Sequence, residues 1–132
     1  MDESRPWVTC HVLDTVAGKP GAGIDVHLWL YGRENIVMYF TATTNSDGRV
    51  TDWTEVDTKD PRSLNDWVKV LQDPRPGGSL RFKMTFYTEE YFGKGNTFFP
   101  FVDINFEAKC SEPHYHVPLL LGPWSYTTYR GS

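Results

Sequence analysis

The sequence predicts an all-β fold, an antiparallel β-sandwich of about eight strands with one or two short helices. Two observations lead to this prediction. Apolar residues recur at every second position in most apolar segments, which is the period of a strand with one buried face. Turn-forming residues, chiefly Gly, Pro, Asn and Asp, separate these segments at short intervals. The 132 residues suffice for one domain, 1–132, with a single hydrophobic core, and no internal repeat or linker divides them.

The first half of the chain contains four of the expected strands. In the first of them Val8, Cys10 and Val12 share one face and His11 lies on the other. The segment 17–23 is rich in glycine and is expected to be a loop. The four expected strands cover residues 7–13, 24–30, 36–43 and, as a short strand, 50–56.

Residues 57–78 differ in character from the rest of the chain. They contain several prolines and glycines, which predicts a longer loop. Four apolar residues inside the segment recur at helical spacing, which predicts one short helix: Leu64, Trp67, Val68 and Leu71.

The second half is again built from strands. A short helical turn is expected within 88–95, ended by glycine. Pro118 lies inside an apolar strand and lacks a backbone donor, so we expect an edge strand or a bulge there. The remaining expected strands cover residues 80–86, 102–107, 114–121 and 124–129.

The composition excludes some classes of partner. The net charge is −4, so the chain has no overall basic field for binding nucleic acid or an anionic membrane surface. No apolar run approaches the roughly 20 residues of a membrane-spanning helix. The polar start lacks the apolar segment of a signal peptide, and the last three residues are not Ser-Lys-Leu. We therefore expect a cytoplasmic protein, with the peroxisome as the alternative, and two free thiols at Cys10 and Cys110.

The histidines are the first candidates for chemistry. The imidazole titrates near neutral pH, so His11 and His116 are candidates for a general base and a general acid. The alternative is that these histidines have no catalytic role and are ordinary surface or interface residues. A three-histidine zinc site of His11, His114 and His116 is a further alternative. No paired-cysteine or His-Glu-x-x-His spacing supports that site, so we expect neither metal nor cofactor.

Two further features carry candidate residues. Asp47-Gly48-Arg49 is a hairpin turn followed by an arginine, which is either solvated or functional. The tail Tyr129-Arg130-Gly131-Ser132 directly follows an aromatic strand. Chain ends usually fray, but a tail that continues a strand can be held against the structure.

Taken together, these residues resemble the 5-hydroxyisourate hydrolases, the enzyme branch of the transthyretin-like family. The resemblance covers about residues 7–132. The segment 57–78 is longer than the family's connection, and Gly21 and Gly122 stand where alanine and serine are common. The segments that carry the resemblance are His11-Val12-Leu13-Asp14 with Gly18-Lys19-Pro20, Asp47-Gly48-Arg49, His114 to Leu121, and Tyr126 to Ser132.

The resemblance implies a transthyretin-like sandwich that opens the ring of 5-hydroxyisourate. The product is 2-oxo-4-hydroxy-4-carboxy-5-ureidoimidazoline, on the route from urate to allantoin. It further implies a homotetramer with its sites where subunits meet, and no cofactor. The alternatives are a transthyretin-like carrier without enzymatic activity and an adhesive sandwich module. The implied catalytic residues are His11, Arg49 and His116, and the implied substrate-binding residues are His11, Arg49, Tyr129, Arg130 and Ser132.

Overall fold

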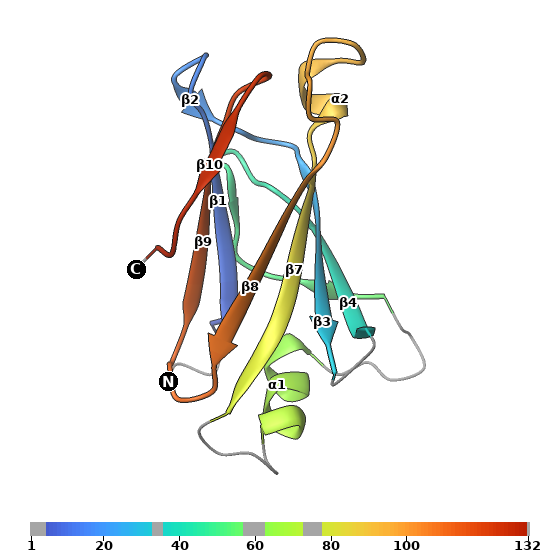
Figure 1. The fold of residues 1–132 in the computed structure, drawn as a ribbon, viewed down its shortest axis with the longest axis vertical. Coiled ribbons are helices and arrows are strands. Elements are labelled where there is room, and N and C mark those ends of the chain that lie inside the picture. The colour runs from blue at the N-terminus through green and yellow to red at the C-terminus, as the bar shows by residue number, and fades with distance from the viewer. Residues whose placement is uncertain (1–4, 33–35, 57–62, 73–77, 132) are drawn as a thin grey trace.

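The chain folds into two β-sheets that pack face to face, as Figure 1 shows. A computed structural model describes residues 5–32, 36–56, 63–72 and 78–131. Sheet A contains β1 (Val8–Asp14), β2 (Lys19–Pro20), β5 (Arg49–Val50), β9 (Tyr115–Leu121) and β10 (Tyr126–Thr128). Sheet B contains β3 (Asp25–Tyr31), β4 (Ile36–Thr43), β6 (Thr54–Glu55), β7 (Ser79–Tyr87) and β8 (Val102–Lys109). The predicted all-β sandwich is confirmed.

The hydrophobic core lies between the two sheets. Alternate residues of each long strand face it, as the period of two predicts, and Val8, Cys10 and Val12 of β1 are fully buried. From sheet B the strands β3 and β7 contribute large buried side chains opposite them, among which are Leu28, Leu30, Phe82, Met84 and Phe86. The other face of each sheet is left available to solvent or to partners.

Two short segments depart from the prediction. The expected strand 50–56 is divided between the sheets, because β5 pairs with β1 whereas β6 pairs with β4. Between them Trp53 is buried, and its indole N–H donates to the carbonyl of Val8 at 2.8 Å. The expected loop 17–23 contains β2, which pairs with the end of β1. Two-residue strands show no alternation, so a pattern search cannot detect them.

Two short helices lie at opposite ends of the sandwich (Figure 1). The helix α1 (Leu64–Gln72) confirms the helix expected within 57–78, and it buries Leu64 and Val68. The remaining parts of the expected loop, 57–62 and 73–77, are outside the described residues. The helix α2 (Glu89–Phe92) ends at Gly93, as expected. No helix in the described part of the chain is long and apolar enough to cross a membrane.

The pairing of β1 with β9 brings the two ends of the chain together. This pair is parallel, whereas the other strand pairs of the described residues are antiparallel. The strand β9 lies between β1 and β10, so it is not an edge strand, which was one of the two settings expected for Pro118. Pairing with β10 stops at Leu119, however, so β9 has no ladder partner from β10 at Pro118. Proline therefore removes no bond to β10 at this position.

The two cysteines are free thiols, as expected. Cys10 is buried in β1, and burial raises the pKa of its thiol to about 12. A thiol with so high a pKa supplies almost no thiolate at neutral pH, so it acts as a small core residue.

Candidate active site

Three of the expected site residues meet on the outer face of sheet A. His11 in β1 lies opposite Arg49 of β5, and Thr9 in β1 lies opposite His116 of β9. The ring centroids of His11 and His116 are 6.4 Å apart. Because Thr9 and His11 alternate with the core residues of β1, their side chains share the face turned away from the core.

The turn before β5 places Arg49 beside His11. The side-chain oxygen of Asn45 accepts hydrogen bonds from the backbone N–H groups of Asp47 and Arg49, at 2.9 and 3.0 Å. Gly48 has a φ of +75°, and a Cβ there would lie 2.4 Å from the carbonyl oxygen of Val12. Only glycine allows the turn to approach β1 this closely, so the Asp-Gly-Arg sequence delivers an exposed arginine to the histidine pair.

A cavity of about 140 Å³ adjoins Arg49 and His116, and His11 is not among its lining residues. Its wall includes Arg49 and His116 together with Arg5 and Pro6, which precede β1. Neither Arg5 nor Pro6 was predicted to lie at the site. Their contribution depends on the path that the chain follows into β1.

The hydroxyl of Thr9 joins two of the histidines. Its oxygen lies 2.8 Å from Nδ1 of His116 and 3.1 Å from Nε2 of His114. The other ring nitrogen of His114, Nδ1, lies 3.0 Å from the carbonyl oxygen of Pro6. Thr9 was missed in the sequence, although its position two residues before His11 places both on one face.

The surroundings of His114 and His116 favour the neutral forms of these two side chains. Partial burial lowers the pKa of His116, and the nearby positive charge of Arg49, with His11, His114 and Arg5, lowers it further. Burial also lowers the pKa of His114, and Arg5 adds to this effect, while the hydrogen bond to Pro6 opposes it. A neutral imidazole can accept a proton, so His116 meets the protonation requirement of a general base near neutral pH.

The tail passes directly beside His116. The backbone N–H of Gly131 donates to the carbonyl of His116 at 2.9 Å. A Cβ on Gly131 would lie 2.9 Å from Cδ2 of His116 and 3.0 Å from Cγ of Pro118. The tail is thus held against the site, at a distance that only glycine permits.

The other tail residues have different surroundings. Tyr129 is exposed. The guanidinium carbon of Arg130 lies 4.9 Å from the centre of the Tyr115 ring, and Nη2 lies 3.8 Å from a carboxylate oxygen of Glu112. These contacts suit an anchor for the tail, which is one of the two roles open to Arg130. Ser132 is outside the described residues.

The described residues contain no group of three His, Cys, Asp or Glu side chains arranged to hold a metal ion. In particular, the ring nitrogens of His114 and His116 that face each other both bond to the Thr9 hydroxyl between them.

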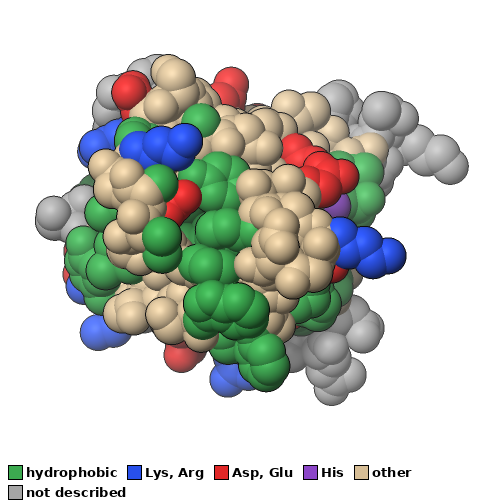
Figure 2. Space-filling model, turned by 90° about the horizontal axis from the view of Figure 1, so that it is seen from above, with side chains coloured by type: hydrophobic (Ala, Val, Ile, Leu, Met, Phe, Trp, Pro, Cys, Tyr) green, Lys and Arg blue, Asp and Glu red, His purple; other side chains and the backbone are tan. Residues whose placement is uncertain are grey.

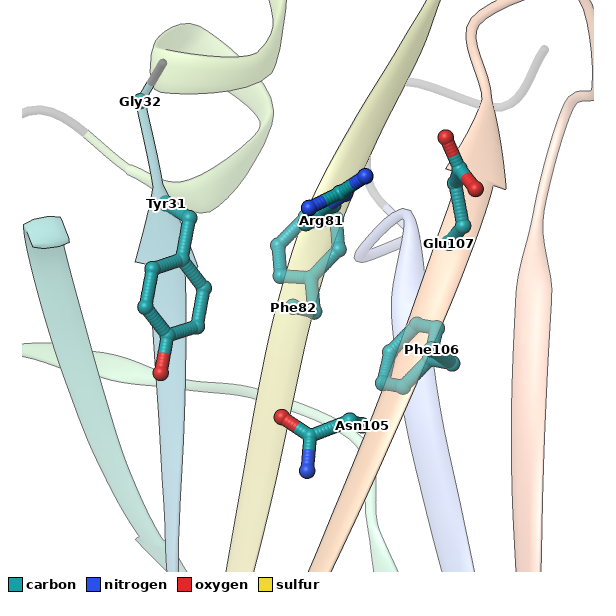
Figure 3. A pocket seen from close by; sticks show the side chains of 7 residues that line it. All are labelled: Tyr31, Gly32, Arg81, Phe82, Asn105, Phe106 and Glu107. Atoms are coloured by element: carbon teal, nitrogen blue, oxygen red, sulfur yellow. The ribbon is translucent and has the colours of Figure 1, made fainter. Parts of the chain in front are cut away.

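A larger cavity, of about 580 Å³, lies elsewhere, on sheet B. Figure 3 shows side chains from β3, β7 and β8 around it, among them Tyr31, Arg81, Asn105 and Glu107. It contains no histidine and adjoins the opposite sheet from β1 and β9. Size alone does not make it the better candidate, because groups able to transfer protons at neutral pH gather at the smaller cavity.

The molecule is a transthyretin-like β-sandwich with a histidine–arginine cluster on the outer face of sheet A. The chain belongs to the HIUase/Transthyretin family, whose model matches residues 8–131. A protein from Deinococcus radiodurans named 5-hydroxyisourate hydrolase is 37% identical over 137 residues, which cover 97% of this chain and 98% of that protein.

Solved structures agree with this placement. The 5-hydroxyisourate hydrolase of Klebsiella pneumoniae matches with a TM-score of 0.64 and 25% identity, over 96% of this chain and 99% of that one. (S)-allantoin synthase matches with a TM-score of 0.68 and 30% identity, over 97% of this chain, which spans 44% of that longer one. The transthyretin of Sparus aurata, 19% identical, matches with a TM-score of 0.68 over 96% of this chain and 97% of that one, and shows the fold alone.

Proposed function

We propose that this protein is a 5-hydroxyisourate hydrolase, which opens the ring of oxidised urate by hydrolysis of a cyclic amide. The product is 2-oxo-4-hydroxy-4-carboxy-5-ureidoimidazoline. The observation that carries the proposal is the meeting of His11, Arg49 and His116 in a chain that matches a protein of that name over 97% of its residues. An imidazole beside a guanidinium suits the hydrolysis of an amide, because the imidazole can transfer the proton and the guanidinium can stabilise the oxyanion.

The reaction requires one proton to be moved twice. One imidazole accepts a proton from water while the water oxygen forms a bond to the substrate carbonyl carbon. The carbonyl electron pair moves to oxygen and gives an oxyanion. When that pair returns, the bond from carbon to the ring nitrogen breaks, and the nitrogen takes up the proton from the imidazolium. Proton transfer of this kind contributes about 10²- to 10⁴-fold to a rate.

Arg49 is assigned to charge stabilisation. Its guanidinium is always charged and presents several N–H donors in a fixed plane. It lies opposite His11 in the strand register and lines the cavity beside His116. From there it binds the substrate and stabilises the oxyanion, and one donor in such a position is often worth about 3 kcal/mol.

The tail residues are assigned to substrate binding. Gly131 passes beside His116, which lines the cavity, and this supports a binding role for its neighbours Tyr129 and Arg130. The assignment of Ser132 rests on the resemblance to the family alone. In this proposal the tail forms one wall, and its side chains bind the ring or the attacking water.

We extend the proposal to a homotetramer whose sites lie where subunits meet. A cavity of about 140 Å³ is smaller than the roughly 300–1,000 Å³ of ordinary ligand sites, so a second copy would supply the missing walls. Hydrophobic side chains also gather at the end of the sandwich shown in Figure 2. The loop after α2 and the β9–β10 hairpin lie at this end in Figure 1, and they contain Phe98 and Trp124, which are 70% and 68% exposed. Light scattering on the purified protein tests this extension, and a fully active monomer would remove it.

For the location of the enzyme we propose the cytoplasm, with the peroxisome as the alternative. Fluorescence microscopy of the untagged protein with a specific antibody tests this, and co-localisation with a secretory marker contradicts it.

The second candidate function is a carrier without enzymatic activity. The fold does not separate the two, since the transthyretin of Sparus aurata has the same one. What favours the enzyme is the histidine pair with Arg49, because a carrier has no need for groups that transfer protons.

An activity assay with matched variants tests the proposed function. The decay of freshly generated 5-hydroxyisourate is followed in the ultraviolet for the wild type and for His11→Ala, Arg49→Ala and His116→Ala. Two variants on the outer face of sheet B serve as controls, His27→Ala for the histidines and Arg81→Ala for the arginine. We expect the three site variants to lose activity at least 100-fold and the controls to retain it. Near-normal turnover by Arg49→Ala would overturn the assignment.

A further inference from the structure

The hydroxyl group of Thr9 in β1 connects His116 in β9 with His114, which lies directly before β9. Thr9 is only 8% exposed, and its oxygen lies between the rings of His114 and His116. His114 in turn reaches the carbonyl of Pro6. The result is a continuous chain of hydrogen bonds from the Pro6 carbonyl, through His114 and Thr9, to Nδ1 of His116.

The direction of each hydrogen bond follows from the Pro6 end. A carbonyl oxygen can only accept, so Nδ1 of His114 carries a proton and donates it. In a neutral ring Nε2 of His114 is then an acceptor, and the Thr9 hydroxyl donates to it. Since the hydroxyl proton of Thr9 is used in this bond, the Thr9 oxygen can only accept in its bond with Nδ1 of His116. Nδ1 of His116 must therefore carry the proton. The reverse direction would place two acceptors 3.0 Å apart at Pro6.

We propose that Pro6, His114 and Thr9 form a hydrogen-bonded chain that holds neutral His116 in its Nδ1–H tautomer and leaves Nε2 as the proton acceptor at the cavity. The inference rests on the proposed function and deepens it, because it makes His116 the general base. Nε2 of His116 has no hydrogen-bond partner among the described residues, so it is available to a water molecule. Thr9 and His114 act here as positioning residues, through their hydrogen bonds to the ring of His116.

The charges around His116 agree with this arrangement. The groups that face it are Arg5, Arg49, His11 and His114, and all of them disfavour a positive charge on its ring. The same chain also has an acid-sensitive member. Protonation of His114 would make its Nε2 a donor, turn the Thr9 hydroxyl toward His116, and move the His116 proton to Nε2. Nε2 would then no longer be a base.

Two conservative variants of Thr9 separate the hydroxyl from the shape of the side chain. Thr9→Val keeps the volume and removes the hydrogen bonds, whereas Thr9→Ser keeps the hydroxyl. We expect Thr9→Val to lower kcat about three- to tenfold at unchanged KM, the range that corresponds to one hydrogen bond. Thr9→Ser should retain most of the wild-type kcat. The acid limb of the pH profile of kcat/KM should shift in Thr9→Val and stay in place in Thr9→Ser.

The tautomer is measured without substrate. Nitrogen-15 NMR of the histidine rings distinguishes a proton on Nδ1 from a proton on Nε2, and His116→Gln assigns the signal. We expect the Nδ1–H form in the wild type and in Thr9→Ser, and a mixture of tautomers in Thr9→Val.

The outcomes separate the inference from the function on which it rests. An Nε2–H signal for His116 in the wild type would overturn the inference even if the enzyme is active and Thr9→Val does not fold. A folded Thr9→Val with wild-type kcat and pH profile would also overturn it. If the wild type does not open 5-hydroxyisourate, the proposed function fails and the NMR result alone decides whether the chain orients His116.

Discussion

Replacement of Gly131 by alanine tests whether the tail is part of the site. The added Cβ would lie 2.9 Å from Cδ2 of His116 and 3.0 Å from Cγ of Pro118. Carbon atoms in good contact are about 3.5–4.0 Å apart, so the tail has to retreat by about 0.5–1 Å. The hydrogen bond from the Gly131 N–H to the His116 carbonyl, now 2.9 Å, would then be lost or much weakened.

The expected effects on stability and activity differ in size. One such hydrogen bond is worth about 0.5–1.5 kcal/mol of unfolding free energy, which lowers the Tm of a chain of this length by about 2–6 °C. A displacement of about 1 Å in the wall of an active site can cost about 100-fold in rate. We therefore expect Gly131→Ala to lower kcat/KM at least about tenfold while the protein stays folded at the assay temperature.

Gly122→Ala is the matched control, because it lies in the hairpin that joins β9 to β10. A Cβ there would meet its nearest atom, the carbonyl oxygen of Ser125, at 3.4 Å, an ordinary contact. Thermal denaturation and the ultraviolet assay are run on both variants. Wild-type kcat/KM in Gly131→Ala would show that the tail does not shape the site, and an equal loss in Gly122→Ala would assign the effect to the hairpin as a whole.

Three further predictions concern pH, a buried carboxylate and metals. Folding lowers the pKa of His27, His114 and His116 below the ordinary 6.5, so the unfolded chain binds more protons and the stability of the fold decreases as the pH drops below about 6.5. Measurement of the Tm from pH 8 to 5.5 checks this prediction, and a constant Tm would contradict it. Tyr91→Phe removes the hydroxyl that donates to Oδ2 of the buried Asp14 at 2.7 Å. It should lower the free energy of unfolding in urea by about 1–3 kcal/mol and leave kcat unchanged. An unchanged midpoint of urea unfolding would mean that water replaces the lost hydrogen bond. Prolonged treatment with a chelator should leave the activity intact, and loss of activity restored by zinc would revive the three-histidine metal site.

The long strands and both helices could be predicted because each follows from local pattern. Buried and exposed residues alternate in β1, β3 and β7, and the spacing of Leu64 and Val68 marks α1. The segments that were mispredicted lack such a pattern. The strands β2, β5 and β6 have two residues each, and their pairing depends on where the neighbouring strand already lies.

The candidate site also has one part that could be predicted from the sequence and one part that could not. Histidine and arginine could be identified as candidates by their chemistry, and the resemblance to a family supplied their grouping. The sequence did not indicate a role for Arg5 or Pro6 beside the cavity. Nor did it suggest that a threonine hydroxyl would separate His114 from His116, which were considered as joint metal ligands.

By itself the sequence determined the fold class, the face of β1 on which His11 lies, and the residue types available for proton transfer. These depend on the period of a strand and on intrinsic pKa values, which are local properties. The tertiary structure decided which of those residues meet. His11 and His116 stand 105 positions apart in the chain and are joined by the parallel pairing of β1 with β9. It also decided that His114 and His116 share the hydroxyl of Thr9, because a hydrogen bond between distant segments depends on strand register, which no local pattern encodes.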